Sequence, residues 1–407
     1  MAIGASAGGI IRAAFRGKTM KKNMEIEALR GLAVVAVIIS HFGNTAYWVP
    51  GLGEKLSSYG LAAGVDLFFV ISGFVITRAF YGSIRNSAER GLGAFFSEVR
   101  SFMIRRLFRV MPAAIIWMLI ICACSLWFNT TTIFSTLQAN FSDLVAVAFN
   151  VSNIYFAKCM EAGTQGWCGY NSVYWSVSLE EQFYLFFPLI VLLPRKLVVV
   201  ATLAVVVWMA HLERGILEWF TRIDGLLSGI CLAFAFETVR FQKLAKWPLD
   251  RFLPKAALMV GLCAAIVMMP VIGAHFAPRA YPELITLCCV ALVALASFQK
   301  GFTFREGWLR SIAAYIGTRS FSLYLTHNPA AWITRELAAT FGYLDGKQLP
   351  TEPTAFAVFA VVLMVVMSEL TYLMIETPWR EWGRRIATVP VRQAKATAPT
   401  VTPAAAA

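Results

Sequence analysis

The chain has 407 residues, of which 58% are hydrophobic and 14% charged, and its formal net charge is +13 at pH 7. About a quarter of the residues of a soluble domain are charged, so this composition excludes a soluble globular protein and indicates a polytopic membrane protein. The positive charge does not require a nucleic-acid partner, because membrane proteins collect Lys and Arg beside the anionic cytoplasmic leaflet.

Apolar runs long enough to cross a bilayer begin near ten positions. These positions are residues 31, 61, 111, 175, 197, 216, 256, 282, 312 and 355. The run 137–156 is rejected as an eleventh span because it carries an aspartate and three asparagines. With ten helices, Lys and Arg concentrate on the side of both termini, which places the N- and C-termini in the cytoplasm. The sequence therefore predicts an all-α membrane protein.

The two ends of the chain differ in composition from the apolar region. Residues 1–23 are rich in Gly, Ala and Lys and are expected to be a flexible basic lead-in, whereas residues 387–407 are rich in Ala, Pro and Thr and are expected to be disordered. Residues 24–386 are expected to form one membrane domain. No small-residue cleavage pattern follows the first apolar run, so that run is expected to be a retained anchor.

The first apolar segment reads EALRGLAVVAVIISHF, with Arg30 at its start and His41 inside it. The eleven positions between them amount to three helical turns plus about 20°, so the two side chains share one helix face roughly 16 Å apart along the axis. A cation at a membrane boundary and an imidazole at membrane depth suggest the two ends of a site. In the simpler alternative, Arg30 is a positive-inside anchor and His41 a buried structural histidine.

Further ionisable groups lie at one level of the predicted bundle. Asp66, Glu180 and Asp224 lie, like His41, about 8 to 12 Å below the predicted outer ends of their helices. An uncompensated charge at that depth is costly, so these groups are expected to have partners or functions. Asp66 or Glu180 is expected to orient the imidazole of His41. The expected substrate-binding residues are Tyr174, Trp175, Tyr184, Arg222, Asp224 and His327.

A second layer, of arginines, is predicted at the cytoplasmic boundary. It consists of Arg30, Arg78, Arg106 and Arg109. A guanidinium cluster suits the phosphates of a cofactor, and ordinary contact with anionic lipids is the alternative. A secondary transporter with an intramembrane proton relay is the alternative for the whole protein. The lack of an evident inverted repeat, and the position of the arginines at one face, disfavour a transporter.

The cysteines show no metal-ligand spacing. Six of the eight fall in apolar segments, where a free cysteine behaves as a small hydrophobic residue. Cys159 and Cys168 lie instead in the long outer loop before Tyr174 and enclose eight residues. A disulfide is predicted between them, because this loop is expected to face an oxidising compartment.

Seven motifs occur in a fixed order between Glu27 and about Arg380. They are EALRGLA, GVDLFFVISGFVIT, RRLFRVMP, WSVSLEEQFYLFFP, RIDGLLSG, SLYLTH and ETPWR. As a set they resemble the integral-membrane acyltransferase family 3, which includes bacterial O-acetyltransferases of O-antigen, exopolysaccharide and Nod factor. The resemblance covers nearly the whole chain.

The resemblance implies ten helices in the bacterial inner membrane and no permanently bound cofactor. It implies a cytoplasmic acyl-CoA, above all acetyl-CoA, as co-substrate, and transfer to a hydroxyl of a cell-surface glycan or lipid-linked saccharide. Arg30 and His41 match the family's arginine–histidine motif, and Arg106 and Arg109 match its arginine pair. Glu180 matches the carboxylate of a Trp-Ser-Leu-x-x-Glu motif in which Val177 here replaces leucine.

Two questions stay open at the level of sequence. His41 is expected to act either as general base on the sugar hydroxyl or as carrier of the acyl group, and the same residues serve both mechanisms. Some family members append a periplasmic transferase domain, which is not expected in these 407 residues. The membrane domain is therefore expected to complete the transfer itself or to pass the acyl group to another protein.

Overall fold

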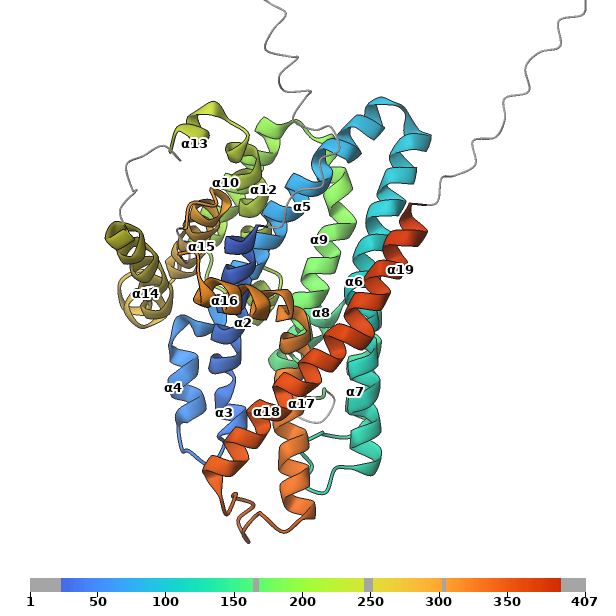
Figure 1. Ribbon diagram of the computed structural model, residues 1–407, viewed down its shortest axis with the longest axis vertical. Coiled ribbons are helices and arrows are strands. Elements are labelled where there is room, and N and C mark those ends of the chain that lie inside the picture. Colours follow the sequence, from blue (N-terminus) through green and yellow to red (C-terminus); the bar gives the residue numbers. More distant parts are fainter. Residues whose placement is uncertain (1–22, 164–167, 245–251, 302–304, 389–407) are drawn as a thin grey trace, which may run out of the picture.

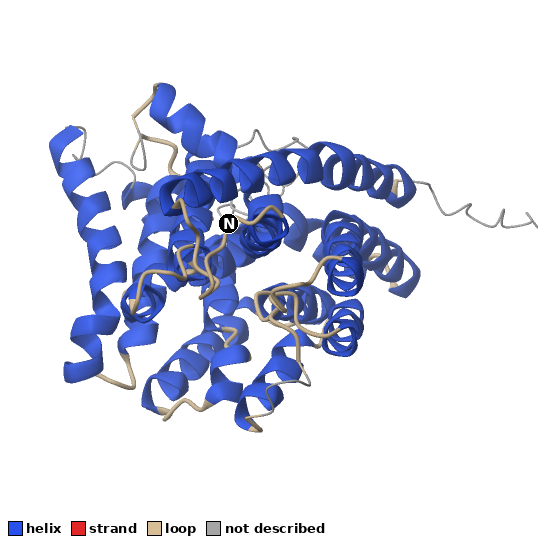
Figure 2. Cartoon of the chain, turned by 90° about the horizontal axis from the view of Figure 1, so that it is seen from below, coloured by secondary structure: helices blue, strands red, loops and turns tan. Residues whose placement is uncertain are grey.

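The computed structural model describes residues 23–163, 168–244, 252–301 and 305–388. Within these ranges the chain forms helices, their connections and one antiparallel β-bridge between Leu344 and Pro350, which confirms the all-α prediction (Figure 2). The predicted lead-in before residue 23 and the predicted tail after residue 388 lie outside the described residues.

Figure 1 shows the helices in chain order. They are α2 (Met24–Ser40), α3 (Phe42–Thr45), α4 (Leu52–Ser58), η1 (Gly60–Ala63), α5 (Gly64–Glu89), α6 (Leu92–Trp127), α7 (Leu137–Ala148), α8 (Ser152–Glu161), α9 (Tyr174–Leu192), α10 (Arg195–His211), α11 (Ile216–Phe220), α12 (Asp224–Phe236), α13 (Val239–Leu244), α14 (Phe252–Phe276), α15 (Tyr281–Ser297), α16 (Trp308–Thr318), α17 (Ser320–Thr340), α18 (Pro353–Thr371), the π-helix η2 (Tyr372–Glu376) and α19 (Thr377–Ala387). Helices α2 and α5 lie near the centre of the bundle (Figure 1).

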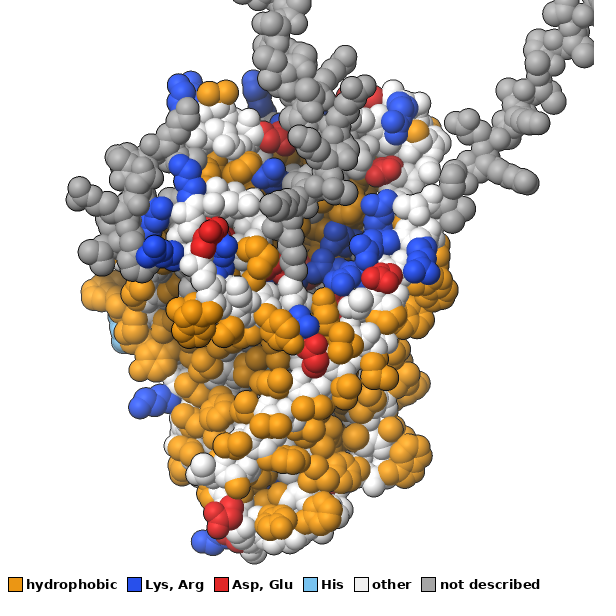
Figure 3. Space-filling model, in the orientation of Figure 1, with side chains coloured by type: hydrophobic (Ala, Val, Ile, Leu, Met, Phe, Trp, Pro, Cys, Tyr) orange, Lys and Arg blue, Asp and Glu red, His pale blue; other side chains and the backbone are white. Residues whose placement is uncertain are grey.

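Five helical segments of the described chain are long and apolar enough to cross a membrane. They are Gly60–Glu89, Leu92–Trp127, Ile216–Phe236, Lys255–Phe276 and Pro353–Ala387. Hydrophobic side chains cover the lower part of the face seen in Figure 3, and most Lys and Arg side chains lie toward its upper part. This distribution fits a membrane protein, while the count of ten helices and the cytoplasmic location of the termini stay predictions.

The structure agrees with the rejection of one apolar run and differs in detail from two predicted spans. The rejected run 137–156 forms α7 and the start of α8, which have 12 and 10 residues and are each too short to cross a bilayer. The ninth predicted span is divided at Arg319 into α16 and α17. The first is also interrupted, because α2 ends at Ser40 and His41 is its C-terminal cap instead of an interior residue.

The end of α2 has a local cause. The carbonyl oxygen of Val37 accepts hydrogen bonds from the Ser40 hydroxyl at 2.7 Å and from Nδ1 of His41 at 2.9 Å. Such side-chain bonds compete with the regular backbone ladder. Gly43 and Asn44, which follow, are poor helix formers. The histidine is therefore held at a break between α2 and α3.

Glycines allow two pairs of helices to approach within backbone contact. A Cβ atom added at Gly31 of α2 would collide with the carbonyl oxygen of Ala313 in α16, and one at Gly317 would collide with that of Glu27. The same holds where α5 crosses α12, at Gly73 against Leu226. These close crossings follow the small-residue rule for packing in membranes and fix α2 and α5 in the bundle.

The structure joins Cys159 to Cys168 in a disulfide, with the Cα atoms 6.4 Å apart. The bond ties the end of α8 to the segment that leads into α9. A buried network holds the same segment. The Asn171 side-chain amide donates to Asn140 at 2.9 Å and to Asp143 at 2.8 Å. The start of α9 is therefore anchored to both α7 and α8.

We expect Gly31→Ala to destabilise the protein, because the added methyl group forces α2 away from α16. Overpacking of this kind costs about 1 to 3 kcal/mol, so the thermal unfolding midpoint of the detergent-solubilised protein should fall by several degrees. Gly93→Ala is the matched control, because a Cβ at Gly93 has no heavy atom within 4 Å. Equal midpoints for the two variants would contradict the proposed close packing.

Candidate active site

A cavity of about 70 Å³ lies among α2, α5, α6, α9 and α17. We call it the arginine cavity, and its polar lining consists of Arg30, Ser72, Arg109, Ser176, Glu180, Tyr184, Ser320 and Tyr324. Glu180 accepts hydrogen bonds from the Ser72 hydroxyl at 2.5 Å and from the Tyr184 hydroxyl. Arg30 lies 3.9 Å from Glu27. The cavity therefore places two guanidinium groups beside a hydrogen-bonded carboxylate.

The four predicted donor-binding arginines do not all reach this cavity. Arg30 and Arg109 line it, and Arg106 lies behind its wall with its guanidinium carbon 5.1 Å from the ring centroid of Phe80 and 5.5 Å from that of Tyr184. Arg78 lies elsewhere, 4.2 Å from the ring centroid of Phe236 in α12. The expectation that Arg78 joins the other arginines is therefore wrong, because its helix turns it toward α12.

A second, smaller cavity of about 20 Å³ lies where the break after α2 meets α17 and α18. We call it the histidine cavity, and it is lined by Ile38, His41, Phe42, Thr45, His327, Asn328, Ala331, Ala360, Val361 and Met364. The ring centroids of His41 and His327 are 5.2 Å apart. Asn44 donates to Asn328 at 3.3 Å and ties α3 to α17. The structure thus brings His327, one of the expected substrate-binding residues, next to His41.

The two cavities are stacked along the same helices. Arg30 of α2 and Tyr324 of α17 line the arginine cavity. His41 at the end of α2 and His327 of α17 line the histidine cavity. The rings of Tyr324 and His327 are 5.8 Å apart between centroids. The Tyr324 hydroxyl donates to the Val173 carbonyl at 2.8 Å, which holds this ring beside the arginine cavity. Tyr324 therefore lines the arginine cavity and neighbours a histidine of the other cavity.

Asp66 belongs to a third, separate group. It pairs with Arg222 at 3.1 Å, and Asp224 accepts a hydrogen bond from Thr286 at 2.8 Å. Arg214 and Glu283 form a further buried ion pair. We call the set Asp66, Arg214, Arg222, Asp224, Glu283 and Thr286 the buried ion cluster.

Neither predicted carboxylate is a partner of His41. Nδ1 of His41 contacts the Val37 carbonyl and the Ser40 hydroxyl, whereas Asp66 pairs with Arg222 and Glu180 with Ser72 and Tyr184. The expectation that Asp66 or Glu180 orients the imidazole is therefore wrong. Equal depth in the membrane did not imply contact, because the groups face different sides of their helices.

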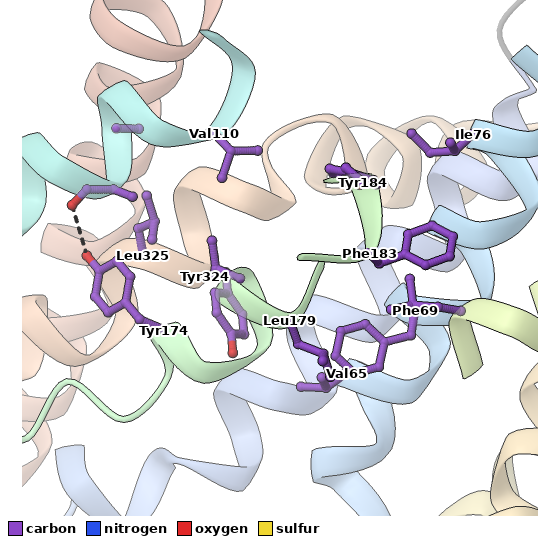
Figure 4. Close-up of a cluster of buried hydrophobic side chains, with 14 of the residues drawn as sticks. Val65, Phe69, Ile76, Val110, Tyr174, Leu179, Phe183, Tyr184, Tyr324 and Leu325 are labelled. Carbon is purple, nitrogen blue, oxygen red and sulfur yellow. Dashed lines mark hydrogen bonds between the residues drawn. The ribbon is translucent and has the colours of Figure 1, made fainter. Parts of the chain in front are cut away.

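The aromatic residues predicted to bind substrate have structural neighbours. Tyr174 is buried in the core, and its hydroxyl donates to the Ala114 carbonyl at 3.5 Å (Figure 4). Trp175 packs on Phe69 and Phe220, with centroid distances of 5.8 and 5.3 Å, and the Arg222 guanidinium lies 5.5 Å from its ring. Of the predicted aromatic residues, only Tyr184 lines the arginine cavity.

Six polar residues of the two cavities were not singled out from the sequence as site residues. Ser72, Ser176, Ser320 and Tyr324 line the arginine cavity, and Thr45 and Asn328 line the histidine cavity. Apart from Thr45, each lies in a helix of a predicted span, so a polar side chain within an apolar run was the available signal. Ser72 is six positions after Asp66, a rotation of about 240° along the helix, which places the two side chains on different faces of α5.

Comparison with known proteins identifies the family of this chain. A family model described as an acyltransferase domain matches residues 23–373, which is most of the chain. The chain therefore belongs to this acyltransferase family, in agreement with the resemblance of its motifs. No solved structure matches the chain significantly.

Its curated relatives are bacterial O-acetyltransferases by name. The chain is 27% identical over 391 residues to a Staphylococcus aureus protein named provisionally as an O-acetyltransferase, covering 90% of this chain and 58% of the relative. It is 27% identical over 390 residues to the peptidoglycan O-acetyltransferase OatA of Listeria monocytogenes, covering 88% of this chain and 56% of the relative. The chain thus spans less than two thirds of the length of these relatives.

The pairing of Asp66 with Arg222 can be tested through its effect on stability. Asp66→Ala and Arg222→Ala should each lower the thermal midpoint strongly, because removing one partner of a buried pair costs about 3 to 5 kcal/mol. The double variant should lose less than the two single losses combined. The exposed pair Glu213 and Arg279, with 78% and 56% of their side-chain surfaces exposed, is the control and should show no such coupling. Additive losses at Asp66 and Arg222 would contradict the pairing.

Proposed function

We propose that the protein transfers an acyl group, in the first place acetyl, from cytoplasmic acyl-CoA to a hydroxyl of a cell-surface or lipid-linked glycan. Its membership of an acyltransferase family supports acyl transfer. The names of its relatives support an O-acetyl product, and the Listeria relative makes peptidoglycan one candidate acceptor. The observation that carries the proposal is the stacking of the arginine cavity and the histidine cavity along α2 and α17.

The arginine cavity is the proposed donor site. Arg30 and Arg109 would bind phosphate oxygens of acyl-CoA, since planar guanidinium groups bind phosphate through paired hydrogen bonds. Arg106 adds positive charge from behind the wall. The pantetheine arm would extend along α2 toward His41, over a distance comparable to the three helical turns between Arg30 and His41. This assignment requires the arginine cavity to face the cytoplasm.

The histidine cavity is the proposed site of transfer. Nδ1 of His41 contacts the Val37 carbonyl at 2.9 Å, and because a carbonyl oxygen only accepts, Nδ1 carries the proton. Nε2 is then free to accept a proton from the acceptor hydroxyl or to receive the acyl group. The backbone carbonyl of Val37 thus takes the orienting role that a carboxylate has in a catalytic triad.

Replacing Arg109 by Ala should weaken acetyl-CoA binding at least ~10-fold without loss of folded protein, because one bidentate phosphate contact is removed. Arg109→Lys should restore binding only in part, since lysine lacks the planar fork. Arg78→Ala is the matched control, because Arg78 packs on Phe236 away from the cavity. Binding of acetyl-CoA to purified protein is measured by calorimetry. Equal affinities for the two Ala variants would contradict the assignment of the arginine cavity as the donor site.

His41→Ala should reduce transfer at least ~100-fold, which is the usual scale for loss of a general base, and should leave acetyl-CoA binding nearly unchanged. The measurement is incorporation of labelled acetyl from acetyl-CoA into membrane glycan, divided by the amount of folded protein. If His41 only packs, the variant will reduce folded protein while transfer per folded molecule stays near normal. Uptake of a solute by the wild type without any acetyl transfer would instead support a secondary transporter.

A further inference from the structure

The histidine cavity contains one imidazole more than the proposed reaction uses. His327 lies in α17 with 6% of its surface exposed, and its ring centroid is 5.2 Å from that of His41. Nε2 of His327 is buried and has no hydrogen-bond partner among the described residues. A buried polar atom without a partner is unfavourable, so such an atom in a cavity indicates a ligand group that binds there.

The two rings have the same hydrogen-bond pattern. Nδ1 of His41 contacts the Val37 carbonyl at 2.9 Å, and Nδ1 of His327 contacts the Tyr324 carbonyl at 2.7 Å. Both Nδ1 atoms therefore carry protons, which leaves a lone pair on each Nε2. The shared cavity of about 20 Å³ is large enough for one water molecule or one hydroxyl group. Two imidazoles, each with a lone pair on Nε2, thus line a space of the size of a single hydroxyl.

Two imidazoles can perform two tasks that a single one cannot perform at once, namely carrying the acyl group and accepting the proton of the acceptor hydroxyl. If Nε2 of His41 carries an acyl group, the same atom cannot accept a proton from the acceptor hydroxyl. A second base is then needed within reach of that hydroxyl, and His327 is the titratable side chain that shares the cavity. The acyl carrier must accommodate a group of several atoms, which favours His41, the more exposed of the two rings.

We propose that His41 carries the acyl group and that His327 is the general base that activates the acceptor hydroxyl. The inference rests on the proposed acyl transfer and decides between the two mechanisms open for His41. In the first step, Nε2 of His41 attacks the thioester carbonyl carbon, the carbon–sulfur bond breaks, and CoA leaves as the thiolate. Nδ1 keeps its proton, so the acylated ring is cationic.

The second step returns both rings to their starting state. The acceptor hydroxyl gives its proton to Nε2 of His327, its oxygen attacks the acyl carbon, and the bond from that carbon to Nε2 of His41 breaks. The electron pair of this bond returns to His41. His327 then releases its proton, which neutralises the CoA thiolate. The sum of the two steps is thioester plus alcohol giving ester plus thiol.

The test separates acylation from transfer. The variants are produced in cells that lack the chromosomal gene, inverted membrane vesicles supply the native acceptor, and acetyl-CoA labelled in the acetyl group is added from outside. After rapid quenching, label is counted on the protein band and in the glycan. In His327→Phe, label on the protein should exceed the wild-type level at least ~10-fold, and label in the glycan should fall ~100-fold.

Three further variants make the result specific. His327→Gln keeps a hydrogen-bond acceptor but no base, and it should also accumulate label on the protein, so it carries the test if the Phe variant does not fold. His41→Phe should show label neither on the protein nor in the glycan. His211→Phe is the matched control, because His211 is exposed at the end of α10, and it should behave as the wild type.

The outcomes distinguish failure of the two-histidine mechanism from failure of the proposed acyl transfer itself. If the wild type acetylates glycan while neither folded His327 variant accumulates label on the protein, the two-histidine mechanism is wrong and the proposed acyl transfer stands. Normal glycan labelling in His327→Phe has the same meaning. If the wild type labels no glycan in vesicles that contain folded protein, the proposed function itself fails.

Discussion

Charges buried in an apolar helical bundle must find partners inside the protein, and this constraint organises the structure around α5. That helix supplies Asp66 to Arg222 and Ser72 to Glu180, on two different faces. Directly after Ser72, Gly73 lets α12 approach within backbone contact. Because α5 pairs with α12 on one side and α9 on another, the buried ion cluster and the arginine cavity are fixed relative to each other. Loss of the Asp66–Arg222 pairing would leave a buried charge without its partner.

The sequence predicted what depends on composition and local pattern. Hydropathy indicated an all-α membrane protein, and loop context indicated the bond between Cys159 and Cys168. The positions of Arg30 and His41 on one stripe of the first segment also correspond to two cavities in the structure. These features could be predicted because a helix places residues by a fixed rise and rotation, so spacing along the chain translates directly into position.

The sorting of the ionisable groups could not be predicted in the same way. Depth along a helix follows from residue spacing, but the direction in which each helix faces is set by tertiary packing. His41, Asp66 and Glu180 therefore share a predicted level and belong to three separate groups in the structure. Arg78 shows the same limit, because only the position of α12 decides that it packs on Phe236. The end of α2 at Ser40 likewise depends on side-chain bonds to one carbonyl.

The separation of the two cavities by Tyr324 bears on the electrical barrier of the membrane. Moving one elementary charge across a potential of 100 mV changes its free energy by about 2.3 kcal/mol. Phosphates held by Arg30 and Arg109 would stay on one side of this ring, whereas an acetyl group carries no charge and could pass it without electrical work. A bundle of this design would transmit a chemical group across the bilayer while remaining closed to ions, so the membrane voltage would neither drive nor oppose the reaction.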